Sequence, residues 1–140
     1  MVDVSAKPVL LREATARGEI RLQRATLELI ESQKIAKGNV LATARVAGIQ
    51  AAKRTGELIP LCHPLPLTHC EVNFEVPDSK DRIVITASAK VAAQTGIEME
   101  VLTAVAIAAL TIYDMCKAVD KKMRITDVEL VSKTKRNPEK

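Results

Sequence analysis

The chain has 140 residues, 47% of them hydrophobic and 27% charged, which is typical of one folded domain and excludes a disordered segment. Its net charge of +4 is compatible with nucleic acid, a membrane surface or a small polyanion as partner. A single Tyr, a single Phe and no Trp leave almost no aromatic surface on which single-stranded nucleic acid stacks, so a small anionic ligand is favoured instead.

The scarcity of aromatic residues also predicts how the chain is stabilised. A core of Ala, Val, Ile and Leu buries little area per residue, so we expect oligomerisation to supply part of the stability. Three cysteines without CxxC spacing, Cys62, Cys70 and Cys116, argue against a disulfide framework and against structural zinc. No leader-like segment is expected, which predicts a cytoplasmic protein that does not bind membranes.

The first half of the chain predicts an arm, a strand and two helices. Residues 1–18 lack periodicity and contain Pro8, so we expect an arm that a partner or ligand orders. Residues 18–23 alternate as in a strand, and residues 25–32 form a short helix. A longer helix is expected over residues 39–58 with Asn39 as its N-cap, and the prolines after it exclude a helix.

The second half predicts a hairpin, a long helix and a last strand. Strands are expected over residues 70–76 and 82–91, a largely apolar helix over residues 97–119, and a strand over residues 123–131. Residues 134–140 are expected to be a mobile tail of the single domain 1–140. This order predicts an α+β fold: a ferredoxin-like antiparallel sheet with helices packed on one face.

Asp114 and Lys117 are the first candidates for chemistry. Their spacing places them on one face of the long helix, and their apolar neighbours predict that the pair lies in or beside a core. A carboxylate and an ammonium partly removed from water form a candidate acid–base couple. The spacing alone favours an ordinary surface ion pair, and the apolar neighbours make the two interpretations about equal.

Three further segments are candidates for ligand binding. His63 is held between two prolines beside Leu61 and Cys62, which suits a positioned side chain, although a structural histidine is the commoner case. Glu98 and Glu100 open the long helix, where at most one of them faces a given site. The basic residues are a candidate phosphate site or a solvated face: Arg12, Lys37, Arg45, Lys53 and Arg54.

Several blocks of sequence resemble one family over nearly the whole chain. The segments are residues 1–7, 37–55, 58–65, 95–104 and 109–121, and they are similar to molybdenum cofactor biosynthesis protein C, the cyclic pyranopterin monophosphate synthase family. The resemblance implies a lyase that converts a 3',8-cyclised dihydro-GTP to cyclic pyranopterin monophosphate and releases pyrophosphate. It also implies a homo-hexamer, a trimer of dimers, with the active site at a subunit interface and no redox cofactor.

The resemblance assigns roles to particular residues. Asp114 is implied as the catalytic acid–base residue with Lys117 as its partner, and Lys37 as a further catalytic or phosphate-contacting lysine. Substrate contacts are implied at Leu61, Cys62, His63, Met99, Glu100, Lys53 and Arg12. No metal ligand is implied, and the spacing of the histidines matches no metal motif.

Two departures from the family pattern stand out. Gln94 occupies a position where a lysine is expected, which would remove one phosphate contact. The tail lacks the usual glycine-rich run after the last strand, although Lys133 still matches.

Two alternatives stay open at this point. One is another nucleotide-processing lyase or phosphotransferase, which would act on GTP itself. The other is a non-catalytic nucleotide- or anion-binding regulatory subunit of ferredoxin-like fold, which would bind anions tightly and yield no product.

Overall fold

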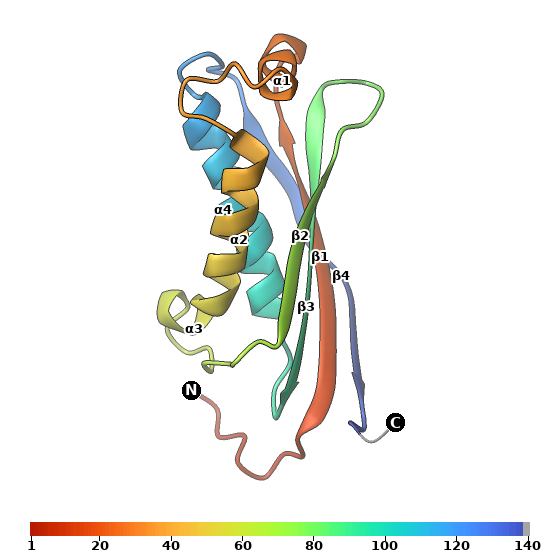
Figure 1. Ribbon diagram of the computed structural model, residues 1–140. Coiled ribbons are helices and arrows are strands. Elements are labelled where there is room, and N and C mark those ends of the chain that lie inside the picture. The colour runs from red at the N-terminus through yellow and green to blue at the C-terminus, as the bar shows by residue number, and fades with distance from the viewer. Residues whose placement is uncertain (139–140) are drawn as a thin grey trace.

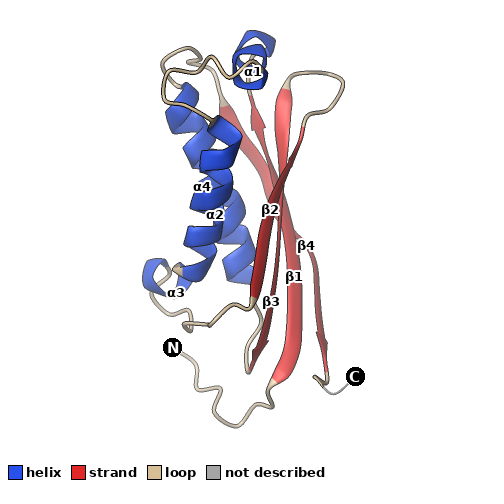
Figure 2. Cartoon of the chain, in the orientation of Figure 1, coloured by secondary structure: helices blue, strands red, loops and turns tan. Residues whose placement is uncertain are grey.

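A computed structural model describes residues 1–138 and shows one antiparallel sheet with helices on one of its faces (Figures 1 and 2). The strands are β1 (Leu10–Arg21), β2 (His69–Glu75), β3 (Arg82–Ala93) and β4 (Arg124–Arg136). The helices are α1 (Arg24–Glu31), α2 (Val40–Lys53), α3 (Thr55–Leu58) and α4 (Glu98–Cys116). The strand order is β2-β3-β1-β4, with every neighbouring pair antiparallel.

The connections between the strands define the topology. α2 lies on the path from β1 to β2, and α4 lies on the path from β3 to β4, so each long helix crosses over one neighbouring strand. This arrangement is the ferredoxin-like plan, and the predicted fold class is confirmed. α2 and α4 run side by side over the sheet, while α1 and α3 lie at opposite ends of this helical layer (Figure 1).

Alternation along β3 explains which face of the sheet the helices cover. Ile83, Ile85, Ala87, Ala89 and Val91 are buried, whereas the residues between them are partly or fully exposed. Side chains in a strand point alternately to its two faces, so one face of β3 is apolar and packs beneath the helices. The opposite face of the sheet is rich in charged side chains.

Small residues let α2 and α4 approach each other closely. A Cβ atom placed on Gly48 of α2 would lie 3.0 Å from the Ala104 carbonyl oxygen and 3.1 Å from Val72 Cγ2. Ala104 and Ala108 on the facing side of α4 are fully buried. The core is therefore dense although it contains almost no aromatic residues.

The structure corrects the expected boundaries at both ends of the chain. β1 begins at Leu10, so the arm is confined to residues 1–9 and the second half of the expected arm is strand. β4 continues to Arg136 because residues 134–136 pair with residues 11–13 of β1, so this part of the expected tail is ordered by the sheet. Residues 139–140 of the expected tail lie outside the described residues.

The expected helix over residues 39–58 is divided into α2 and α3. Asn39 caps α2 as predicted: its Oδ1 accepts a hydrogen bond from Ala42 N at 3.0 Å. Near the other end, Thr55 Oγ1 donates to the carbonyl oxygens of Ala51 and Ala52 at 2.9 and 3.1 Å. Side chains that bond back to the preceding turn in this way commonly bend or end helices.

α4 is long and apolar enough to cross a membrane by composition alone. Half of its most apolar window is buried within the fold, and the helix packs against α2, β1 and β3. We therefore interpret α4 as a core helix.

Candidate functional site

Three of the predicted residues meet at the C-terminal end of α4. Lys37 Nζ donates to Asp114 Oδ2 at 2.9 Å and approaches the Asp114 carbonyl oxygen at 3.3 Å. Lys117 Nζ lies 3.1 Å from Oδ1 of the same carboxylate. The two lysines hold the pKa of Asp114 below its ordinary value, with Lys37 contributing most. One carboxylate thus orients two ammonium groups, which leaves a net positive cluster.

The loop before α2 explains how Lys37 reaches α4. Ile35 is buried and anchors the loop, and Gly38 has a φ of 112°, a conformation that L-residues rarely adopt. The chain then enters α2 at its Asn39 cap. These three local features fix the backbone on both sides of Lys37.

The expectation that Asp114 and Lys117 are withdrawn into a core is wrong for the single chain. The Asp114 side chain is 56% exposed and Lys117 is 58% exposed. The apolar neighbours that suggested burial, such as Ile112 and Met115, point to the sheet side of α4, and the charged pair lies on the other side. Helical periodicity separates the two sets although they are adjacent in sequence.

A different set of predicted residues gathers at the N-terminal end of α4. Glu100 is 2% exposed, and its Oε1 has no hydrogen-bond partner among the described residues. Burial, helped by the nearby charge of Glu98, raises the pKa of Glu100. Cys62 Sγ lies 4.0 Å from Glu100 Oε2, and burial together with the two glutamates raises the pKa of this thiol. Cys62 is therefore poorly suited to act as a thiolate nucleophile.

The proline-flanked loop presents His63 to the N-terminal arm. His63 Nε2 donates a hydrogen bond to the Val2 carbonyl oxygen at 2.7 Å. Two other predicted contact residues are open to solvent, Leu61 at 70% exposed and Met99 at 38%. Exposed apolar side chains beside a buried carboxyl are available to contact a ring-bearing ligand.

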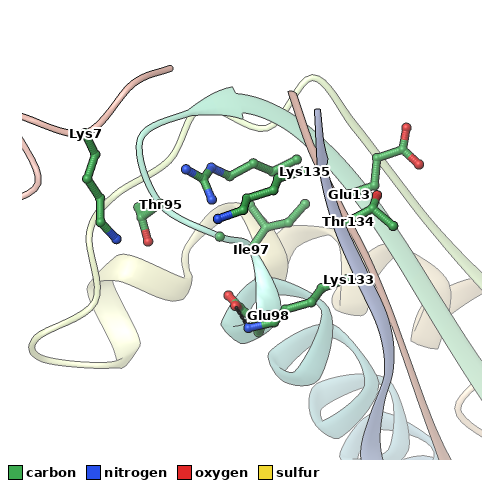
Figure 3. A pocket seen from close by; sticks show the side chains of 10 residues that line it. Lys7, Glu13, Thr95, Ile97, Glu98, Lys133, Thr134 and Lys135 are labelled. Carbon is green, nitrogen blue, oxygen red and sulfur yellow. Dashed lines mark hydrogen bonds and ion pairs between the residues drawn. The ribbon is translucent and has the colours of Figure 1, made fainter. Parts of the chain in front are cut away.

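A cavity of about 350 Å³ opens beside the start of α4 (Figure 3). The walls come from the arm, β1, β4 and the turn before α4, and contain Lys7, Arg12, Glu13, Thr95, Gly96, Ile97, Glu98, Lys133, Thr134 and Lys135. Lys133 Nζ lies 3.1 Å from Glu98 Oε1. Although burial opposes it, the backbone N–H at the helix start and Lys133 lower the pKa of Glu98.

The electrostatics of this cavity favour an anion. Four cationic side chains face two carboxylates, so the cavity keeps a net positive charge beside the N-terminal end of α4, where the helix dipole also favours an anion. A phosphate chain suits such a surface because several ammonium and guanidinium donors can share its charge.

The basic residues of α2 do not form the phosphate site considered from their spacing. Arg45 Nε donates to the Val72 carbonyl oxygen at 2.8 Å, and its guanidinium lies over the Phe74 ring. Lys53 is exposed at the far end of α2 from Lys37, about 20 Å away by helix rise. Arg12 is the predicted cation that lines the cavity, and its Nε is held by the Ala93 carbonyl oxygen at 3.0 Å.

Within one chain the predicted residues therefore form two separate groups. Fourteen residues of helix separate Glu100 from Asp114, which corresponds to about 21 Å. The group at the C-terminal end contains Asp114, Lys117 and Lys37, and the group at the N-terminal end contains Glu100, Met99, Cys62, His63, Leu61 and Arg12. The two groups therefore lie at opposite ends of α4 in the single chain.

Sequence reasoning missed Lys7 and Lys135. Lys135 lies directly opposite Arg12 in the pairing of β4 with β1, so only the strand register reveals that the two cations are neighbours. Lys7 is part of the arm, whose course no periodicity predicts. Within residues 1–138, no group of three or more His, Cys, Asp or Glu side chains is arranged to hold a metal ion.

The ferredoxin-like fold and the lysine-flanked carboxylate define a small α+β protein with a cationic cavity beside its core helix. Comparison with known proteins assigns the chain to one family. The chain belongs to the MoaC family, whose model matches residues 1–136.

Curated relatives agree with the family match. The chain is 59% identical over 133 residues to a protein of Chloroflexus aggregans named cyclic pyranopterin monophosphate synthase, covering 95% of this chain and 81% of the relative. It is 58% identical over 134 residues to a protein of the same name from Desulfitobacterium hafniense, and the match covers 96% of this chain and 82% of the relative. A third relative, cyclic pyranopterin monophosphate synthase 3 of Mycobacterium tuberculosis, is 57% identical to this chain over 134 residues. The match covers 96% of this chain and 75% of the relative.

Proposed function

We propose that this chain is a cyclic pyranopterin monophosphate synthase, a lyase of molybdenum cofactor biosynthesis. Its substrate is the 3',8-cyclised dihydro-GTP, and its second product is pyrophosphate. The observation that carries the proposal is the Asp114 carboxylate held between two lysines, 2.9 and 3.1 Å away, in a chain that belongs to the MoaC family.

The cluster at the C-terminal end of α4 supplies the proton transfers. Rebuilding a purine-derived skeleton requires a proton to be removed and returned several times, and a positioned acid or base contributes about 10²- to 10⁴-fold to each such step. Lys117 acts as the proton shuttle, and Asp114 holds its ammonium toward the reacting ring. Lys37 is held by the same carboxylate and shares the negative charge that develops on the substrate.

The cavity at the other end of α4 suits the phosphate chain. A sugar hydroxyl attacks the α-phosphorus, the hydroxyl proton is lost, and the bond to the leaving pyrophosphate breaks. Cations around the leaving group stabilise its charge, which is the role assigned to Arg12 and Lys133 of the cavity. The family resemblance adds Lys53 and His63 as further phosphate contacts. Burial shifts Glu100 toward its neutral form. Its carboxyl group donates or accepts a hydrogen bond at the edge of the purine-derived base of the substrate.

A complete site requires two copies of the chain. The separation of the two groups by about 21 Å of helix supports this arrangement, because a second copy can supply the missing group at each end. We infer a homo-hexamer, a trimer of dimers, whose active sites lie at subunit interfaces. Exposed apolar residues on the outer surface of the helices, Val46 and Leu110, are available for such contacts. Three free thiols suit the reducing cytoplasm as the place of action.

The direct test is incubation of the purified protein with the cyclised GTP intermediate, followed by detection of cyclic pyranopterin monophosphate and of pyrophosphate. We expect both products in equal amounts, and no product from GTP. Turnover of GTP itself, or tight binding of the intermediate without product, would contradict the proposal and favour one of the two alternatives.

A further inference from the structure

Gln94 holds the N-terminal arm against the sheet. Its side-chain Nε2 donates to two backbone carbonyl oxygens of the arm, that of Lys7 at 3.1 Å and that of Ser5 at 3.3 Å. Gln94 directly follows the last residue of β3, so its backbone is anchored by a strand in the middle of the sheet. The carboxamide thus connects a rigid element to a segment that forms no helix or strand.

The rest of the arm makes few hydrogen bonds to the body of the protein. Lys7 N donates to the Val4 carbonyl oxygen at 3.0 Å and Ser5 N to Asp3 Oδ1 at 2.9 Å, which are bonds within the arm. Within residues 1–138, the arm is also attached to the body of the protein by the hydrogen bond from His63 to the Val2 carbonyl oxygen. Residues 1–3 and 5–9 are exposed, so apolar burial contributes little to fixing the arm.

The position that Gln94 fixes is that of Lys7. This side chain extends from the arm beside Thr95 and lines the cationic cavity together with Arg12 and Lys133 (Figure 3). Within residues 1–138, the Lys7 ammonium has no hydrogen bond or ion pair, whereas Lys133 is paired with Glu98. Lys7 is therefore a cation of the cavity whose charge is not already neutralised by a carboxylate of this chain.

We propose that Gln94 is a positioning residue that clamps the arm and so delivers the Lys7 ammonium to the phosphate chain of the substrate. A lysine is expected at position 94 from the family pattern, and a neutral glutamine there removes one charge. The two carbonyl contacts show what the glutamine does instead: the cation comes from Lys7, and Gln94 holds it in place. The phosphate ligand in this inference rests on the proposed function.

The key variant is Gln94→Met, which has nearly the same shape and charge but cannot donate a hydrogen bond. Lys7→Met removes the cation itself, and the double variant tests whether Gln94 acts through Lys7. Lys80→Met is the matched control, because Lys80 lies in the β2–β3 turn at the other end of the sheet and pairs with Glu31. Gln94→Lys keeps a donor for the two carbonyls and serves as the rescue variant.

Two measurements on the intact protein are independent of turnover. In hydrogen exchange, we expect Gln94→Met to speed exchange of the amides of residues 3–7 and Lys7→Met to leave them nearly unchanged. In calorimetry with inorganic triphosphate, we expect each single variant to weaken binding by about 3- to 10-fold. The double variant should bind about as weakly as Lys7→Met alone. Lys80→Met should bind as tightly as the unmodified protein, and Gln94→Lys at least as tightly, because it keeps a donor and adds a charge.

Turnover of the cyclised nucleotide adds a third measurement. We expect Gln94→Met to raise KM by a similar factor and to leave kcat within about 2-fold, because a cation that binds the phosphate chain equally in the ground state and in the transition state affects binding and not the proton transfers. Unchanged exchange in Gln94→Met, additive losses in the double variant, or no binding of triphosphate by the unmodified protein would each overturn the inference. Triphosphate binding with the expected pattern but no turnover would refute the proposed function and leave the role of Gln94 intact.

Discussion

The two ends of α4 carry carboxylates in opposite electrostatic situations. At the C-terminal end, Asp114 is exposed and held by two lysines, which keep it ionised by lowering its pKa. At the N-terminal end, Glu100 is buried, has an unpaired oxygen and is shifted toward its neutral form by burial. One helix therefore presents a carboxylate whose pKa is lowered by two lysines at one end and a carboxyl whose pKa is raised by burial at the other.

The physical reason for the difference lies in which side of the helix each residue occupies. Glu100 lies on the same buried side as Val101 and Ala104, where the sheet and Cys62 exclude water. Asp114 lies on the outer side, where the loop carrying Lys37 passes. Opposite pKa shifts at acid–base sites arise from such differences in surroundings, so the two groups are suited to different steps of one reaction.

The largest effect is expected from Asp114→Asn, which removes the charge that orients Lys37 and Lys117. We expect kcat with the cyclised substrate to fall by about 10²- to 10⁴-fold, because two positioned cations lose their common anchor. The melting temperature should hardly change, since the ion pairs are exposed. Asp127→Asn in β4 is the control, and near-normal turnover by Asp114→Asn would exclude this cluster from the chemistry.

A second prediction concerns the hydrogen bonds that fix the turn after the C-terminal end of α4. Asp120, which is 2% exposed, accepts hydrogen bonds from Gln23 N at 2.9 Å, Thr26 Oγ1 at 2.8 Å and Lys122 N at 3.0 Å. It joins the turn after α4 to the start of α1. Asp120→Ala leaves these donors without their partner, and we expect a loss of about 2–4 kcal/mol in the free energy of unfolding, measured by denaturant titration.

Asp78→Ala, in the exposed β2–β3 turn, is the control for this measurement and should leave the free energy of unfolding nearly unchanged. Asp120→Asn keeps one acceptor oxygen and should give an intermediate loss. Equal stability of Asp120→Ala and the unmodified protein would show that the turn after α4 is held by other contacts.

A third prediction tests the close contact between α2 and α4 at Gly48. Gly48→Ala inserts a methyl group 3.0 Å from the Ala104 carbonyl oxygen, a backbone atom that can move little. We expect a loss of about 1–2 kcal/mol in stability, because overpacking outweighs the gain in helix propensity. Gln50→Ala on the exposed side of α2 is the control and should leave the stability nearly unchanged. A stabilised Gly48→Ala would show that the two helices can separate without cost.

The smallest effect is expected at Glu100. Its folded pKa is raised above the unfolded value of 4.5, so its contribution to stability is present below that value and is lost as the pH rises through the folded pKa. Glu100→Gln cannot ionise, so its melting temperature relative to the unmodified protein should increase as the pH rises from about 4 to 7. Glu57→Gln, at an exposed position of α3, is the control, and a constant difference would show that folding does not raise the pKa of Glu100.

Much of the fold could be predicted from local pattern. The alternation in β3, the Asn39 cap and the small-residue faces of α2 and α4 each indicate an element directly, because side-chain period and capping depend on neighbours in sequence. The start of β1 was missed because its inward-facing residues, Ala14 and Ala16, are small and give a weak alternating signal. Pairing with β3 and β4 on both sides is what makes residues 10–18 a strand.

The sequence by itself determined the ferredoxin-like order of elements and the proximity of Asp114 to Lys117, since both follow from spacing along the chain. Only the tertiary structure decided that Lys37 reaches the same carboxylate, that Glu100 is buried, and that Lys7, Arg12 and Lys135 line one cavity. These relations depend on strand register, on loop paths and on which side of α4 faces the sheet. Contacts between residues distant in sequence set all three, so no local pattern encodes them.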